Sequence, residues 1–117
     1  MDNQLKSHTP DENQIKKVLL DFYDAYYMAD RIKMFSYLNQ SFQDSISLNC
    51  FLIHSDFDID VGILIEIRRI HVERQKKFAL AECLVDFERG KKETVIAFKL
   101  EDEMWKIDGR SVYKRKL

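Results

Sequence analysis

Two groups of side chains in this sequence have the chemistry of acid–base catalysis. His54 lies close to Asp56 and Asp58, and a carboxylate beside an imidazole can fix the tautomer of a general base. Glu82 and Asp86 lie in an apolar stretch, where burial would raise the pKa of a carboxyl group. Each group has a simpler explanation, which is a solvated loop for the first and solubilising or interface charges on an outward strand face for the second.

Aromatic side chains supply a second kind of candidate. Tyr23, Tyr26 and Tyr27 occur together near the N-terminus, and a Tyr hydroxyl in a dry pocket can stabilise a developing oxyanion. The same tyrosines could simply pack in a core, where a buried hydroxyl needs one partner. With Trp105 near the C-terminus, these tyrosines are the candidates for lining a pocket.

The sequence lacks the spacings that hold a metal ion or an organic cofactor. The aspartates from Asp56 onward resemble a calcium loop, but an EF-hand needs Gly at its sixth position and Glu at its twelfth. Here those positions hold Val61 and Ile67. With only three glycines in the chain, a Gly-rich phosphate loop is not expected either. We therefore predict that the protein uses no metal and no cofactor.

Composition places the chain among ordinary globular domains. It has 117 residues, 45% hydrophobic and 33% charged, with a formal net charge of −1, which fits a single domain. Basic residues are more frequent in the second half, but aromatic residues do not alternate with them as base stacking requires. We therefore expect no nucleic-acid partner.

Two observations favour a cytoplasmic protein. No apolar run reaches transmembrane length, and residues 1–8 lack the apolar stretch of a signal peptide. Cys50 and Cys83 have no metal or redox spacing, so we expect two reduced thiols. The prediction is a cytoplasmic protein without a membrane partner.

The first forty residues have the pattern of helices. Thr9, Pro10 and Glu12 form a capping box with proline at the first helical position, and apolar residues then recur at helical spacing. This predicts a helix over residues 10–30, with Tyr26 near the centre of its apolar stripe and Tyr23 on the flank. Asp30 is a suitable cap for a second helix over residues 32–38.

The rest of the chain has the pattern of strands. Residues 45–50 alternate at period two and predict a short strand. A four-stranded antiparallel meander is predicted from Ile63 to Tyr113, with a β-bulge near Arg68 and Arg69, where the apolar set changes face. The predicted core includes Phe22, Tyr26, Phe87, Phe98, Trp105 and Ile107. Helices followed by a meander define an α+β fold, with the helices packed on one face of a curved sheet.

This order of elements resembles the nuclear-transport-factor-two-like superfamily, also called the SnoaL-like or cystatin-like α+β cone. The matching features are the long first helix, the short second helix, and curved strands that end in the segment Met104 to Tyr113. The resemblance implies a cone-shaped α+β barrel around a pocket, often in a homodimer that pairs sheet faces. Its members include isomerases, dehydratases, cyclases and binding modules, so the fold alone does not define an activity.

We therefore predict a flexible segment over residues 1–9 and one cone-shaped domain over residues 10–117. The predicted function is a non-catalytic small-ligand-binding or assembly module, homodimeric through the sheet face, with a small apolar ligand. The alternative is a cofactor-free acid–base enzyme of the isomerase, dehydratase or cyclase type, acting on a small apolar carbonyl compound. A third alternative is an accessory subunit that docks through the basic strand region.

Overall fold

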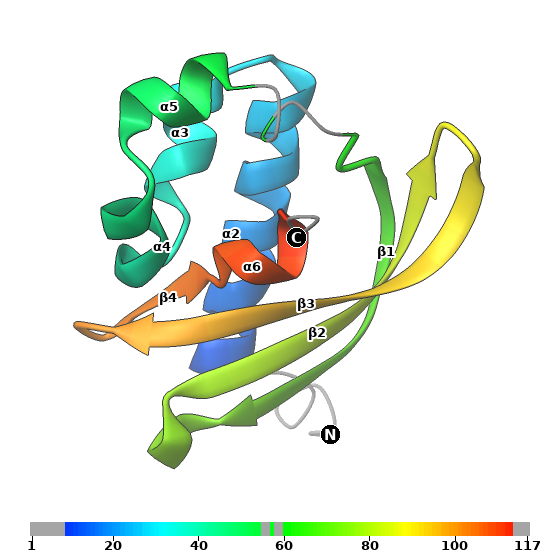
Figure 1. Ribbon diagram of the computed structural model, residues 1–117. Coiled ribbons are helices and arrows are strands. Elements are labelled where there is room, and N and C mark those ends of the chain that lie inside the picture. The colour runs from blue at the N-terminus through cyan, green and yellow to red at the C-terminus, as the bar shows by residue number, and fades with distance from the viewer. Residues whose placement is uncertain (1–8, 55–56, 58–59, 114–117) are drawn as a thin grey trace.

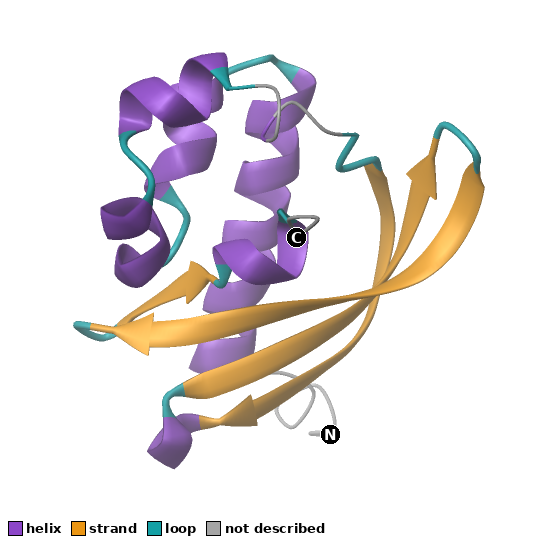
Figure 2. Ribbon diagram, viewed as in Figure 1, coloured by secondary structure: helices purple, strands orange, loops and turns teal. Residues whose placement is uncertain are grey.

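A computed structural model describes residues 9–54, 57 and 60–113 of the chain (Figure 1). Helices come first, and a four-stranded antiparallel sheet with strand order β1-β2-β3-β4 follows. The sheet is strongly curved and open, and the helices lie on its concave side (Figure 2). The α+β prediction is therefore confirmed, and only Thr9 of the segment predicted to be flexible lies within the described residues. The elements are α2 (Pro10–Tyr27), α3 (Arg31–Ser36), α4 (Gln40–Ser45), α5 (Leu48–Ile53), β1 (Ile63–Glu73), η2 (Arg74–Lys76), β2 (Phe78–Phe87), β3 (Gly90–Glu101), β4 (Met104–Ile107) and α6 (Gly109–Val112).

The long helix α2 begins where the sequence predicts. Thr9 Oγ1 accepts a hydrogen bond from Glu12 N at 3.1 Å, and Glu12 Oε1 accepts one from Thr9 N at 3.2 Å, which completes the capping box. The helix ends at Tyr27, earlier than predicted, because Ala29 adopts a left-handed backbone with φ of 60°. Asp30 then caps α3 by accepting a hydrogen bond from Lys33 N, as predicted.

The strand predicted over residues 45–50 is wrong, because two short helices occupy this region. α4 ends at Ser45, and Ser47 begins α5 by accepting a hydrogen bond from Cys50 N at 3.1 Å. The alternating pattern came from a buried Ile46 between the helices and from Leu48, which is 38% exposed. The two residues therefore do not share one strand face.

The four strands pair as a meander, and their register defines the two faces of the sheet. The inner face packs against the helices and carries Ala79, Ala81, Cys83 and Val85 of β2. Opposite Ala79 and Ala81 in β3 lie Phe98 and Ile96, which are also buried. β1 has irregularities in its register between Leu64 and Glu66 and between Ile67 and Arg69. The second of these confirms the predicted bulge near Arg68.

The last strand is shorter than predicted, because β4 ends at Ile107 and a single helical turn, α6, follows. Gly109 begins this turn, and its N–H donates to Asn39 Oδ1 at 3.0 Å. A Cβ atom at Gly109 would lie 2.3 Å from the ring of Phe42, so only glycine permits this close approach. Tyr113, the predicted end of the meander, lies beyond the last strand and is buried.

A single aromatic-rich core fills the space between the helices and the inner face. Phe22, Phe98, Trp105 and Ile107 are buried as predicted. The predicted core residues Tyr26 and Phe87 are only partly buried and pack against this core. Tyr23, 8% exposed, takes the central place predicted for Tyr26. Further aromatic side chains that fill the core are Phe35, Phe42, Phe51, Phe57 and Tyr113.

Candidate functional site

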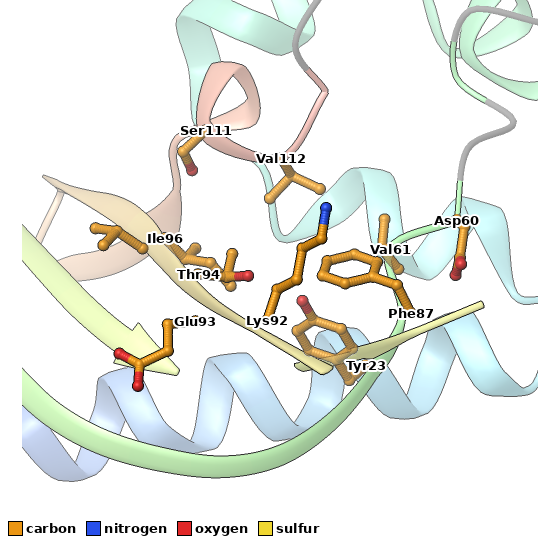
Figure 3. Close-up of a pocket in the computed structure, with 11 residues that line it drawn as sticks. Tyr23, Asp60, Val61, Phe87, Lys92, Glu93, Thr94, Ile96, Ser111 and Val112 are labelled. Carbon is orange, nitrogen blue, oxygen red and sulfur yellow. The ribbon is translucent and has the colours of Figure 1, made fainter. Parts of the chain in front are cut away.

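The main candidate site is a cleft of about 440 Å³ between α2, the first half of β3 and α6 (Figure 3). We call it the α2–β3 cleft. Its walls come from α2, from the residues before β1, from the end of β2, from the first half of β3 and from α6. The residues that line it are Tyr23, Asp60, Val61, Phe87, Lys92, Glu93, Thr94, Val95, Ile96, Ser111 and Val112.

Tyr23 forms part of the cleft wall and is the most buried polar side chain there. It lies on the face of α2 that packs on the sheet, beside Phe22, with ring centroids 5.7 Å apart. Its hydroxyl is directed toward the interior of the cleft (Figure 3). Burial raises the pKa of Tyr23 far above its usual value. Among the described residues no hydrogen-bond partner for this hydroxyl is present, so Tyr23 is a neutral donor facing the cleft.

β3 contributes side chains of alternating direction. Thr94 and Lys92 lie on the inner face, opposite Cys83 and Val85 of β2, and Lys92 extends into the cleft in Figure 3. Within the described part of the chain, Lys92 takes part in no ion pair. Ile96, also on the inner face, is buried and continues into the core. The inner face of β3 therefore changes from apolar to polar toward the mouth of the cleft.

The outer-face residue Glu93 points away from the cleft interior in Figure 3. Its carboxylate pairs with Arg68 of β1 across the outer face. Although Glu93 belongs to the cleft lining, its side-chain charge is directed to the other side of the sheet.

α6 forms the opposite wall and is fixed to β3 by a serine. Ser111 Oγ accepts a hydrogen bond from Ala97 N at 3.1 Å and donates one to Asp108 O at 2.7 Å. Asp108 N in turn donates to Ala97 O at 2.8 Å. These bonds occupy the Ser111 hydroxyl, so its role is to hold α6 beside β3. The neighbouring Val112 gives the wall its apolar surface.

Asp60 lies at the rim and joins three segments. Its carboxylate accepts hydrogen bonds from Glu88 N at 3.0 Å, Gly62 N at 2.8 Å and the Tyr26 hydroxyl at 3.3 Å. The bond from Glu88 N, with smaller contributions from Gly62 and Tyr26, lowers the pKa of Asp60 below its usual value. A carboxylate held in this way is a weak base. Its three hydrogen bonds give Asp60 a structural role, which is to hold the segments before β1, after β2 and at the end of α2 together.

The first catalytic candidate, His54, is exposed at the C-terminal end of α5. Its ring packs at 6.0 Å from the ring of Phe57. Asp56 and Asp58 lie outside the described residues. Neither cleft described here has His54 in its lining.

The strand carboxylates lie on the outer face of the sheet, away from the core. Glu82 lies 3.3 Å from His71 Nε2 in an exposed pair. Asp86 lines a second, more open cleft of about 610 Å³ at the sheet edge, together with Tyr26 and Tyr27. Asp86 therefore lines the same cleft as two tyrosines of α2, whereas Glu82 does not.

The remaining pocket candidates, Tyr27 and Trp105, lie in different places in the structure. Tyr27 is 75% exposed and lines the second cleft with Tyr26. Trp105 is 1% exposed, and its Nε1–H donates to Asp11 Oδ1 at 3.0 Å. Trp105 therefore belongs to the core below α2, and neither cleft has it in its lining.

Sequence reasoning missed Lys92, Thr94, Ser111 and Asp60 as site residues. A usable signal existed for two of them. Lys92 and Thr94 continue the period-two series of Ile96, Phe98 and Leu100, which fixes them on the same face. No comparable signal marks Ser111, because α6 was not expected.

The described residues contain no group of three or more side chains suited to hold a metal ion. Cys50 and Cys83 are free thiols. Burial raises the pKa of Cys83 to about 11, so this thiol is protonated and unreactive at neutral pH.

No protein-family model matches this chain, and no curated protein matches it either. The likeness to the nuclear-transport-factor-two-like superfamily therefore stays a prediction. None of the helices in the described part of the chain has the length and apolar run needed to cross a bilayer.

Proposed function

We propose that the chain is a non-catalytic binding or assembly module of the nuclear-transport-factor-two-like type, and that it receives a small apolar group in the α2–β3 cleft. The observation that carries this proposal is the Tyr23 hydroxyl, which lies on a side chain only 8% exposed, faces the cleft and has no hydrogen-bond partner in the described chain. A guest in the cleft can supply the acceptor that this donor lacks within the protein. Ligand sites commonly combine apolar walls with a few such polar groups.

The walls of the cleft support an apolar guest. Val61, Phe87, Ile96 and Val112 surround the space near the Tyr23 hydroxyl. Thr94 and Lys92, on the inner face of β3, add polar groups to this lining. A guest with a ring or branched chain and one acceptor oxygen fits this distribution of apolar and polar groups.

Titration with benzyl alcohol, followed by two-dimensional NMR, tests the proposal. We expect saturable shifts, and affinity reduced about tenfold in Tyr23→Phe, which removes the hydroxyl and keeps the ring. Tyr27→Phe is the matched control, because Tyr27 belongs to the same helix and is 75% exposed. Absence of saturable binding, or equal affinity in Tyr23→Phe, would refute the proposal.

The same proposal includes a homodimer formed through the outer face and a cytoplasmic location. The outer face carries Leu80, Leu84 and Ala97, all half-buried, and Val95, which is 52% exposed. Apolar side chains on two neighbouring strands favour a partner surface. The free thiols Cys50 and Cys83 support a reducing compartment.

The catalytic alternative depends on one observation, which is that Asp86 shares the second cleft with Tyr26 and Tyr27. A cofactor-free enzyme acting on a small apolar carbonyl compound would use Asp86 as the base and a tyrosine hydroxyl as the donor. Deuterium exchange at the α-carbon of cyclohexanone tests this alternative. Exchange that the protein accelerates and that Asp86→Asn abolishes would support it, and exchange at the uncatalysed rate would remove it.

A further inference from the structure

The first half of β3 has a free edge that opens on the α2–β3 cleft. β3 extends over Gly90–Glu101, but β4 pairs only with Phe98 to Glu101. Ala97, the next residue back, bonds to Ser111 and Asp108 instead of to a strand. Among the described residues, β3 from Ile96 back to Gly90 therefore has a strand neighbour, β2, on one side only.

The hydrogen-bonding groups on this edge follow from the alternation of an antiparallel strand. The N–H and C=O of Ala97 point away from β2, because they bond to Ser111 and Asp108. Alternate residues of a strand direct these groups to the same side. The N–H and C=O of Val95 and Glu93 therefore also face the open side. Both residues are exposed and line the cleft.

The free part of β3 and the opposite edge strand, β1, differ in regularity. β1, the opposite edge, has irregular register at two places, and Arg68 and Glu66 form an ion pair beside them. Bulges and charges of this kind block the pairing of another strand. β3 pairs with β2 in unbroken register over its whole first half, so its free edge keeps the regular spacing that a further strand needs.

We infer that an extended peptide segment of a partner protein binds the α2–β3 cleft by pairing as an added strand with Glu93 and Val95 of β3. This inference rests on the proposed function of the cleft. It proposes that the apolar group bound there is a side chain of the partner's peptide segment. Strand addition of this type takes affinity from backbone hydrogen bonds and specificity from pockets for alternate side chains. α6 lies beside this edge, because Ser111 bonds to Ala97 where the free part of β3 begins.

The alternation of side chains defines the peptide that fits. Side chains that point to the inner face of the added strand meet Val61, Phe87 and Val112, and the Tyr23 hydroxyl lies below them. These positions favour apolar residues. Side chains on the outer face meet solvent beside Val95 and tolerate polar residues. The expected segment therefore alternates apolar and polar residues.

The test uses a pool of acetylated and amidated pentapeptides of the form Thr-X-Thr-X-Thr, in which X is Val, Leu or Phe. We expect saturable binding to the full chain, with the amide protons of Glu93 and Val95 becoming protected from hydrogen exchange. The amides of Thr94 and Ile96, which already pair with β2, should keep their exchange rates. Absence of binding, or protection elsewhere, would overturn the inference.

A proline substitution removes one edge donor selectively. Val95→Pro deletes the N–H that faces the cleft and leaves the bonds between β2 and β3 intact, since proline is tolerated on a free edge. We expect affinity for the peptide to fall about tenfold relative to the control Val95→Ala. Equal affinity of the two variants would overturn the inference.

N-methylated peptides keep the test decisive if Val95→Pro does not fold. Methylation of the second and fourth residues blocks one edge of the peptide, and methylation of the first, third and fifth blocks the other. We expect one version to bind like the parent and the other to lose binding. Loss of binding by both methylated peptides, or by neither, would contradict strand pairing. Protection of the Glu93 and Val95 amides from exchange in the absence of peptide would also contradict it, because it would indicate pairing between copies of the chain.

Benzyl alcohol binding without peptide binding would leave the proposed function standing and remove only the strand inference.

Discussion

At the scale of single residues, Tyr113 shows how a polar group is buried in this core. The Tyr113 hydroxyl is buried and has no hydrogen-bond partner in the described chain. Its ring packs among Phe42, Phe51 and Phe57. Burial raises the pKa of Tyr113 well above its usual value. The ring therefore stabilises the core, and the hydroxyl opposes it.

Tyr113→Phe should raise the free energy of unfolding by about 1 kcal/mol, because it removes an unsatisfied buried hydroxyl and keeps the ring. Urea unfolding measures the change, with Tyr27→Phe as an exposed control. A loss of about 1 kcal/mol or more would show that the hydroxyl forms a bond that stabilises the fold.

Asp60 predicts how stability changes with acid. Its pKa in the folded state lies below its usual value of 3.8, mainly because it accepts a hydrogen bond from Glu88 N. The Asp60 carboxylate therefore contributes to the free energy of unfolding. This contribution is fully present above the pKa of Asp60 in the unfolded chain and is lost as pH falls through its pKa in the folded protein.

Asp60→Asn should lower the urea midpoint near neutral pH, and its deficit should shrink between about pH 5 and pH 2. Asp24→Asn, which changes an exposed carboxylate on α2, is the control. A deficit that stays constant across this range would mean that the charge of Asp60 does not contribute.

At the scale of elements, α6 completes the cleft and depends on a close contact. Gly109→Ala should destabilise the fold by about 1–3 kcal/mol, because the new Cβ would overlap the Phe42 ring. Arg110→Ala, on the exposed side of the same turn, should change stability by less than about 0.5 kcal/mol.

Phe42→Leu combined with Gly109→Ala should recover part of the loss, since residues in contact do not act independently. Chemical unfolding of the single and double variants measures this coupling. Strictly additive losses would show that the ring of Phe42 is not what excludes a side chain at position 109.

The elements also show what the sequence can predict. The capping box at Thr9, the bulge near Arg68 and the burial of Phe98 follow from local sequence patterns, and all three were predicted correctly. The strand predicted over residues 45–50 failed because alternation over so few residues does not separate a strand from a capped turn of helix. Tyr23 is buried where the sequence predicted Tyr26, because the side of α2 that faces the sheet depends on how the helix crosses the sheet. Helical spacing alone does not define that direction.

The cleft was less predictable than the fold. Its lining comes from segments far apart in the chain, and the position of α6 depends on Ser111 and Gly109. The sequence analysis chose its catalytic candidates, His54, Glu82 and Asp86, by residue type. Residue type does not predict which side chains come together in the folded chain. Lys92 and Thr94 could have been assigned to the inner face by alternation, but not to a cleft.

At the scale of the whole molecule, we predict that two copies of the chain associate through the outer face of the sheet. Leu84→Lys places a charge among half-buried outer-face residues and leaves the inner face unchanged. Light scattering at micromolar concentration should give the wild-type protein twice the chain mass of 14.0 kDa. The variant should give the mass of one chain. A folded wild-type protein with the mass of one chain would refute the proposed homodimer.

The claim on which the whole account depends is that the α2–β3 cleft holds an apolar guest. Intermolecular NOEs between the ring protons of benzyl alcohol and protein methyl groups test it most directly. We predict NOEs to the methyls of Val61, Ile96 and Val112, which line the cleft. NOEs confined to the outer-face methyls of Leu80 and Leu84 would contradict the claim and place the binding surface on the other side of the sheet.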